Sequence, residues 1–133
     1  MIEERVDYYI HSQASLSSSL IGIRSAILKI GFKEPHLSKV LTTVSELGMN
    51  VLKYAKQGKI YLCHAEQKSK KGIEICVKDW GPGIQNIDQA MEESFSSIGT
   101  LGLGLPGVKR MADEFLIESE PLKGTTVKVT FWK

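Results

Sequence analysis

The segment Asp79-Trp80-Gly81-Pro82-Gly83-Ile84 constrains this 133-residue chain more than any other part of its sequence. An apolar strand pattern runs into Asp79, and the glycines after it let the backbone come close to a ligand. A second glycine-rich run covers residues 99–107. Neither run has the spacing Gly-x-x-x-x-Gly-Lys-Ser/Thr, and no Gly-x-Gly-x-x-Gly is placed between a first strand and its helix with an acid further on. The pattern favours a nucleotide pocket unlike the two commoner phosphate loops.

Length and composition favour one soluble domain over residues 1–133. Hydrophobic residues make up 42% of the chain and charged residues 24%, and this length suffices to bury a core without metal or disulfide. The net charge of +2 favours no nucleic-acid partner, and no apolar run reaches membrane-spanning length. The first residues lack a signal-peptide pattern, and Cys63 and Cys76 are expected to be buried, reduced thiols. We therefore expect a cytoplasmic protein with no membrane partner.

The first half of the chain has a strand pattern followed by two helix patterns. Residues 6–11 alternate weakly, and apolar side chains then recur at helical spacing from Leu16 to Ile30, with Gly31 as the expected C-cap. A second, long amphipathic helix starts at Pro35 and ends near Gln57-Gly58.

The second half predicts four further strands, a loop and a helix. Two strand patterns are joined by a lysine-rich tip and predict a hairpin. Many small residues then indicate a long functional loop around one short helix, interpreted as a mobile lid. The expected ranges are strands 59–66 and 72–79, the loop 81–104, a helix 105–115, a strand 116–119, a turn 121–124 and a last strand around 127–131.

A polar stripe on the second predicted helix is the first candidate site. At 3.6 residues per turn, Glu46, Asn50 and Lys53 lie on one side of this helix, opposite its apolar side chains. One interpretation is a solvated helix face. The other is chemical, because the carboxylate can act as a general base, the amide oxygen as a magnesium ligand and the ammonium as a phosphate contact.

Asp79 and the glycines form the second candidate site. The Asp79 carboxylate can accept a hydrogen bond from an exocyclic amine such as that of adenine, although Asp and Gly are also ordinary turn formers. The glycines from Gly99 to Gly107 are either plain loop residues or present amides and a helix N-terminus to a polyphosphate.

Four motifs taken in order resemble the N, G1, G2 and G3 boxes of the GHKL ATPase superfamily. They are Glu46-x-x-x-Asn50, Asp79-x-Gly81-x-Gly83, Gly102-x-Gly104 and Gly124-Thr125. This resemblance implies a Bergerat-type ATP-binding fold, which is an α/β (α+β) two-layer sandwich with a mixed, mostly antiparallel sheet and helices on one face. Within the superfamily, Ser45-Glu46-Leu47 before Asn50 and the run from Gly99 to Met111 are similar to the RsbT-type switch-protein serine/threonine kinases of the stressosome.

The resemblance also implies a role for each motif residue. Asn50 is implied to ligate Mg²⁺ that bridges the ATP phosphates, and Glu46 to act as base towards a substrate hydroxyl. Asp79 is implied to read the adenine amine, with Thr125 supporting that contact directly or through water. The residues implied to bind ATP are Asn50, Lys53, Tyr54, Asp79, Gly81, Gly83, Gly99, Gly102, Leu103, Gly104 and Thr125.

The implied function is an ATP-dependent protein serine/threonine kinase of a bacterial partner-switching pathway. Its substrates would be STAS-domain proteins, and the released kinase would bind and activate a phosphatase. Two alternatives stay open at this point. One is an anti-sigma factor with kinase activity that sequesters a sigma subunit, and the other is a non-catalytic adaptor that binds nucleotide.

Overall fold

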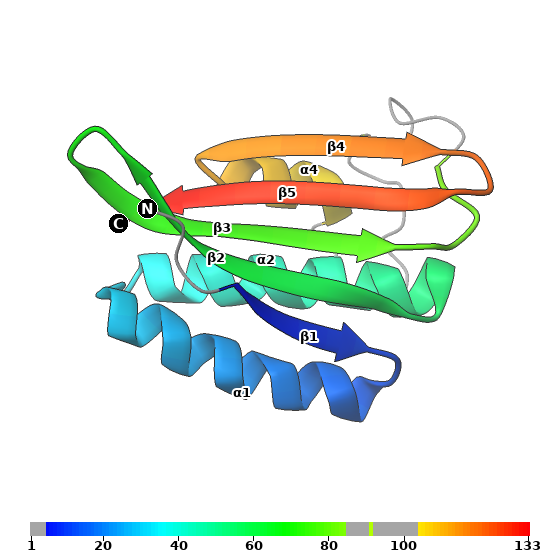
Figure 1. The fold of residues 1–133 in the computed structure, drawn as a ribbon, viewed down its shortest axis with the longest axis horizontal. Helices are drawn as coiled ribbons and strands as arrows, with labels where there is room; N and C mark the ends of the chain where they lie inside the picture. The colour runs from blue at the N-terminus through cyan, green and yellow to red at the C-terminus, as the bar shows by residue number, and fades with distance from the viewer. Residues whose placement is uncertain (1–4, 85–90, 92–103) are drawn as a thin grey trace.

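The computed structural model describes residues 5–84, 91 and 104–133, and it arranges them in two layers with the helices on one face of a sheet (Figure 1). This confirms the predicted α+β sandwich. The elements in chain order are β1 (Val6–Ile10), α1 (Gln13–Ile30), α2 (His36–Asn50), the π-helical segment η1 (Val51–Ala55), β2 (Gly58–Gln67), β3 (Lys70–Asp79), α4 (Gly104–Met111), β4 (Glu114–Glu120) and β5 (Gly124–Trp132).

The sheet has five strands in the order β1-β2-β3-β5-β4, and each of the four pairings is antiparallel. The predicted hairpin is present as β2 and β3, which pair from Gly58 opposite Asp79 to Gln67 opposite Lys70. The last strand, β5, lies between β3 and β4. The end of β3 therefore comes next to the start of β5, although 44 residues separate Asp79 from Gly124 in the sequence (124 − 79 − 1).

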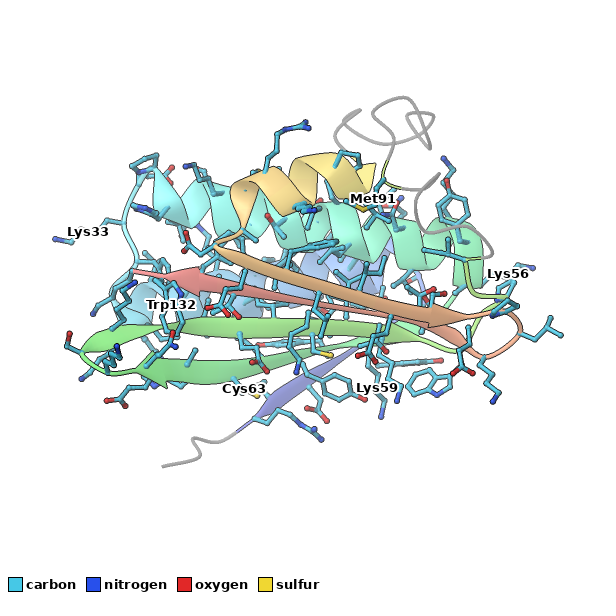
Figure 2. The ribbon with its side chains drawn as sticks, turned by 90° about the horizontal axis from the view of Figure 1, so that it is seen from above. Lys33, Lys56, Lys59, Cys63, Met91 and Trp132 are labelled. Atoms are coloured by element: carbon cyan, nitrogen blue, oxygen red, sulfur yellow. The ribbon has the colours of Figure 1, made fainter. Side chains whose placement is uncertain are left out.

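Alternation along each strand separates a core face from an outer face. Ile60, Ile75 and Val129 are fully buried on the face that the helices cover. Lys59 and Cys63 project from the opposite face (Figure 2). Cys63 and Cys76 are half-buried free thiols on that face, so the expectation of buried cysteines is wrong in degree. Partial burial raises the pKa of both thiols above its ordinary value.

The first helix has the ends that its sequence predicts. Ser12 caps the N-terminus of α1 through a hydrogen bond from the Ser15 amide, and Gly31 ends the helix with φ of +110°. None of the helices in the described ranges is long and apolar enough to cross a membrane.

The ends of two helices differ from the sequence prediction. The second helix is α-helical only to Asn50, and its last turn is the π-helical segment η1. The helix predicted to reach Phe115 ends at Met111, because Glu114 and Phe115 pair with Thr130 and Val129 of β5. Strand pairing outweighs local helical spacing there. Most of the loop predicted over residues 81–104, with its lid, lies outside the described residues.

Candidate nucleotide-binding site

Strand register brings three polar side chains to one end of the sheet. Lys78 of β3 lies opposite Thr126 of β5, and Ser119 of β4 lies opposite Thr125. Successive side chains of a strand point to opposite faces, so Asp79, Ser119 and Thr125 share the face that carries the helices. The structure thus places the predicted residues Asp79 and Thr125 side by side.

The Asp79 carboxylate is held in a fixed orientation by two backbone amides. Its Oδ1 accepts hydrogen bonds from the Gly81 amide at 2.9 Å and from the Thr125 amide at 3.2 Å. Oδ2 takes part in no hydrogen bond among the described residues. Because the residue is only half-buried, this second oxygen can accept a hydrogen bond from a ligand.

The glycines after Asp79 permit close backbone approaches. Gly83 has φ of +79°, and a Cβ there would lie 2.1 Å from the Glu120 carbonyl oxygen. A Cβ on Gly81 would lie 2.5 Å from Ala55 Cβ, at the end of η1. The segment is therefore packed against η1 on one side and against the β4–β5 turn on the other. The Leu122 amide adds a hydrogen bond to the Pro82 carbonyl at 2.6 Å.

Gly58 connects the helix layer to Asp79. A Cβ on Gly58 would lie 2.9 Å from Val51 Cγ1 and 3.3 Å from Asp79 Cβ. Val51 directly follows Asn50, so the junction of α2 and η1 meets the sheet at the end where Asp79 lies. Only a residue without a side chain fits between them.

Glu46 and Asn50 lie one turn apart on α2, in the interior of the helix layer. Glu46 is 2% exposed, so a solvated helix face is the wrong interpretation of this stripe. The reason is tertiary, because α2 lies between α1 and α4 (Figure 1) and is covered on several sides. Asn50 Oδ1 is also buried, and it has no hydrogen-bond partner among the described residues.

Lys53 and Tyr54 do not continue the buried stripe. Both side chains are exposed on η1, with Lys53 Nζ 5.1 Å from the centre of the Tyr54 ring. A π-helical turn spaces its residues differently from an α-helical turn, so a 3.6-residue wheel misplaces them. Lys56, which directly follows η1, lies at one end of the molecule (Figure 2), and η1 carries Lys53 and Tyr54.

The residues present fit a magnesium ion near Asn50. An amide oxygen that is buried without a hydrogen-bond donor costs free energy, and a hard cation is a ligand that would satisfy it. Magnesium commonly takes few protein oxygens and shares its remaining positions with water and phosphate oxygens.

Several predicted site residues lie in the second glycine-rich run. Gly99, Gly102 and Leu103 fall outside the described residues. Gly104 is buried and starts α4 with φ of +57°, a conformation that favours glycine.

Sequence reasoning missed Ser119. Its Oγ accepts a hydrogen bond from the Ile84 amide at 2.6 Å, donates one to the Gly124 carbonyl at 3.1 Å and lies 2.9 Å from Thr125 Oγ1. A serine at the end of a short strand carries no signal of its own. Its position beside Thr125 follows only from the register of β4 and β5.

Comparison with known families identifies this arrangement. The pattern of the histidine kinase-like ATPase domain matches residues 13–131. The chain belongs to this family. That assignment confirms the predicted GHKL fold, with its antiparallel sheet and helices, and it implies the use of ATP.

Individual relatives agree with the predicted resemblance to RsbT-type kinases. The chain is 39% identical to the serine/threonine-protein kinase RsbT of Bacillus subtilis (strain 168), over 82% of each protein. It is 31% identical to an anti-sigma F factor of Shouchella clausii, over 70% of this chain and 67% of that protein. An anti-sigma F factor of Oceanobacillus iheyensis is 29% identical over 83% of this chain and 79% of its own length. The predicted resemblance to RsbT-type kinases is confirmed. The predicted enzyme class, a protein serine/threonine kinase, is the class that the name of the Bacillus subtilis relative gives.

Proposed function

We propose that this family member is a cytoplasmic, RsbT-like protein serine/threonine kinase that uses Mg²⁺ and ATP to phosphorylate STAS-domain proteins in a stressosome-type pathway. The observation that carries the proposal is the pairing of two groups at one end of the molecule. They are an oriented carboxylate at Asp79, whose Oδ2 has no hydrogen bond among the described residues, and a buried amide oxygen at Asn50. One group suits a purine amine and the other a phosphate-bound cation.

Each residue of the site would make a separate contribution. Asp79 Oδ2 accepts a hydrogen bond from the exocyclic amine of the base. Asn50 Oδ1 holds magnesium, which when bound offsets negative charge on the phosphates. Lys53, exposed at the same end, contacts phosphate. The Glu46 carboxylate takes the proton of the acceptor hydroxyl, and it lies one helical turn from the magnesium ligand.

Phosphorylation would also explain how the kinase leaves its substrate and becomes available to a second partner. A phosphate group adds close to two negative charges to the substrate surface, and these charges disfavour a desolvated interface with the kinase. The released kinase would then bind and activate a phosphatase. The support for this step is the similarity to RsbT.

A phosphotransfer assay tests the proposal. The chain is incubated with γ-labelled ATP, Mg²⁺ and each member of a panel of STAS-domain proteins. We expect label on a serine or threonine of at least one STAS protein. Glu46→Gln, which keeps the size of this buried side chain, should abolish transfer and leave ADP affinity within about twofold, whereas Glu66→Gln on the exposed end of β2 should leave both unchanged. Unlabelled STAS proteins, despite bound ATP, would favour a non-catalytic adaptor.

An anti-sigma factor is the second candidate function. The similarity to two anti-sigma F factors favours it, since both alignments cover more than two thirds of the chain. Copurification with a sigma subunit, retained in the presence of ADP, would support this alternative. Loss of the sigma subunit together with efficient labelling of a STAS protein would support the RsbT-like function.

A further inference from the structure

Ser119 lies where three segments of the candidate site meet. Its hydroxyl links Ile84, at the end of the Asp79 loop, to Gly124 and Thr125 at the start of β5. The side chain is partly buried on the face that carries the helices. Through these bonds β4 contacts both the segment that follows Asp79 and the start of β5.

The three contacts match the hydrogen-bond capacity of this hydroxyl in number. A serine hydroxyl has one hydrogen to donate and two lone pairs to accept with. Oγ accepts from the Ile84 amide, which has no lone pair to offer, and donates its hydrogen to the Gly124 carbonyl oxygen. In the remaining contact, 2.9 Å to Thr125 Oγ1, either hydroxyl could be the donor, and a Ser119 hydrogen directed at Gly124 leaves this contact the second lone pair of Ser119. With the Ser119 hydrogen on Gly124, Thr125 is the donor in that contact.

This assignment decides what Thr125 can offer to a ligand. With this assignment the only hydroxyl hydrogen of Thr125 points at Ser119, so its oxygen presents lone pairs to the site. Its backbone amide already donates to Asp79 Oδ1. The two groups beside the base position, Asp79 Oδ2 and Thr125 Oγ1, are then both acceptors.

We propose that Ser119 is a positioning residue that makes the site selective for a purine with an exocyclic amine over a purine with a keto oxygen at the same place. The inference rests on the proposed ATP site. Two acceptors match the amino group of adenine, directly or through a water molecule that donates to them. The same acceptors repel the carbonyl oxygen of hypoxanthine. Without Ser119, the Thr125 hydroxyl can rotate and donate to that oxygen.

Binding of ADP and IDP by calorimetry tests this proposal, because the two nucleotides differ at this base position and neither requires turnover. We expect the wild-type chain to prefer ADP. Ser119→Ala should reduce the ratio of ADP to IDP affinity by about fivefold or more, which corresponds to roughly one hydrogen bond. Ser119→Thr keeps the hydroxyl and should restore most of the ratio. Thr126→Ala removes a hydroxyl from the outer face of the neighbouring position and should leave the ratio unchanged.

A second variant covers the case in which Ser119→Ala folds poorly. Thr125→Val keeps the side-chain shape and removes the acceptor, so it should also lower the ratio of ADP to IDP affinity. The variant that combines Ser119→Ala with Thr125→Val should lower this ratio no more than either substitution alone. Equal losses for both nucleotides, or an unchanged ratio, would overturn the role of Ser119 while leaving an ATP site in place. A wild-type chain that binds neither nucleotide would overturn the proposed function and this inference together. If ADP selectivity depends on Ser119 but no STAS protein is phosphorylated, the proposed phosphorylation of STAS proteins is contradicted and the role of Ser119 is supported.

Discussion

At the residue scale, the orientation of the Asp79 carboxylate makes a sharp prediction for Asp79→Asn. The asparagine oxygen can still accept from the Gly81 and Thr125 amides, as Oδ1 does now. Its NH₂ group would then face the amine of the base, donor against donor. We expect ADP affinity to fall by about 1–3 kcal/mol, the cost of losing a hydrogen bond to a charged group.

Calorimetry with ADP measures this loss, and Asp7→Asn is a matched control. Asp7 is exposed on the edge strand β1, where it pairs with Arg5. Its substitution should leave affinity unchanged. Equal ADP affinity in wild-type chain and Asp79→Asn would show that the carboxylate does not read the base.

Residues inside a spaced motif were predictable from the sequence, and residues placed by strand pairing were not. Asp79 follows an apolar strand and precedes two glycines, so local sequence marks it. Ser119 depends on the register of β4 and β5, which local sequence does not encode. The burial of Glu46 likewise depends on α1 and α4 packing beside α2, which a helical wheel cannot represent.

At the element scale, the turn after β3 depends on the backbone conformation of Gly83. We predict that Gly83→Ala lowers the free energy of unfolding by at least about 1 kcal/mol, because its φ of +79° is strained for alanine. The new Cβ would also lie 2.1 Å from a backbone oxygen. Urea unfolding measures the loss, and ADP affinity should fall as well.

Gly22→Ala in α1 is the control for this prediction. Its new Cβ would meet the Tyr8 hydroxyl at 3.0 Å, a side-chain tip that can shift. Alanine also favours a helix over glycine by about 0.5–1 kcal/mol. A loss of stability as large as that of Gly83→Ala would mean that backbone strain is not the cause.

The N-terminus of α2 predicts a dependence on pH. Pro35 caps the helix without a side-chain hydrogen bond, and the Glu34 carboxylate instead accepts hydrogen bonds from the Ser38 hydroxyl and amide. These bonds hold the pKa of Glu34 below its ordinary value, with the hydroxyl bond as the larger cause. A lowered pKa stabilises the folded chain above the ordinary value, and this contribution is lost as the pH falls through the folded-state pKa.

Comparison of wild-type chain with Glu34→Gln tests that dependence by urea unfolding across the acid range. The difference in stability should be largest near neutral pH and should shrink as the pH falls below about 4.3, the ordinary pKa of glutamate. A difference that stays constant over this range would mean that the carboxylate charge does not contribute. His36→Gln, two residues away on the exposed first turn, should not change the acid profile.

The elements themselves were largely predictable, and their ends less so. Period-2 alternation in residues 72–79 and helical spacing from Leu16 to Ile30 dictate a strand and a helix through burial alone. The π-helical turn η1 is different, because nothing in a 3.6-residue pattern distinguishes it from a continued α-helix. That turn places Lys53 and Tyr54, so their positions required the structure.

At the scale of the whole molecule, the site joins the helix layer to the sheet layer. Asn50 ends α2, Asp79 ends β3, and Gly58 lies against both Val51 and Asp79. A ligand held by both layers binds the folded chain and not the unfolded one. It should therefore stabilise the molecule by mass action, by about 2.7 kcal/mol when its concentration is 100 times its dissociation constant.

This linkage separates the contribution of magnesium from that of the base. We predict that ADP alone raises the melting temperature of the wild-type chain, and that Mg²⁺ added with ADP raises it further. Asn50→Ala should lose the magnesium increment and keep the rise with ADP alone, because its amide oxygen is the proposed metal ligand. Asn50→Asp retains an oxygen ligand and should keep both. Asp79→Asn should show a smaller rise in melting temperature with ADP alone and should keep the further rise that Mg²⁺ adds. If both variants lose the two increments in the same proportion, the amide and the carboxylate do not recognise separate parts of the ligand, and the division of the site between helix and sheet is wrong.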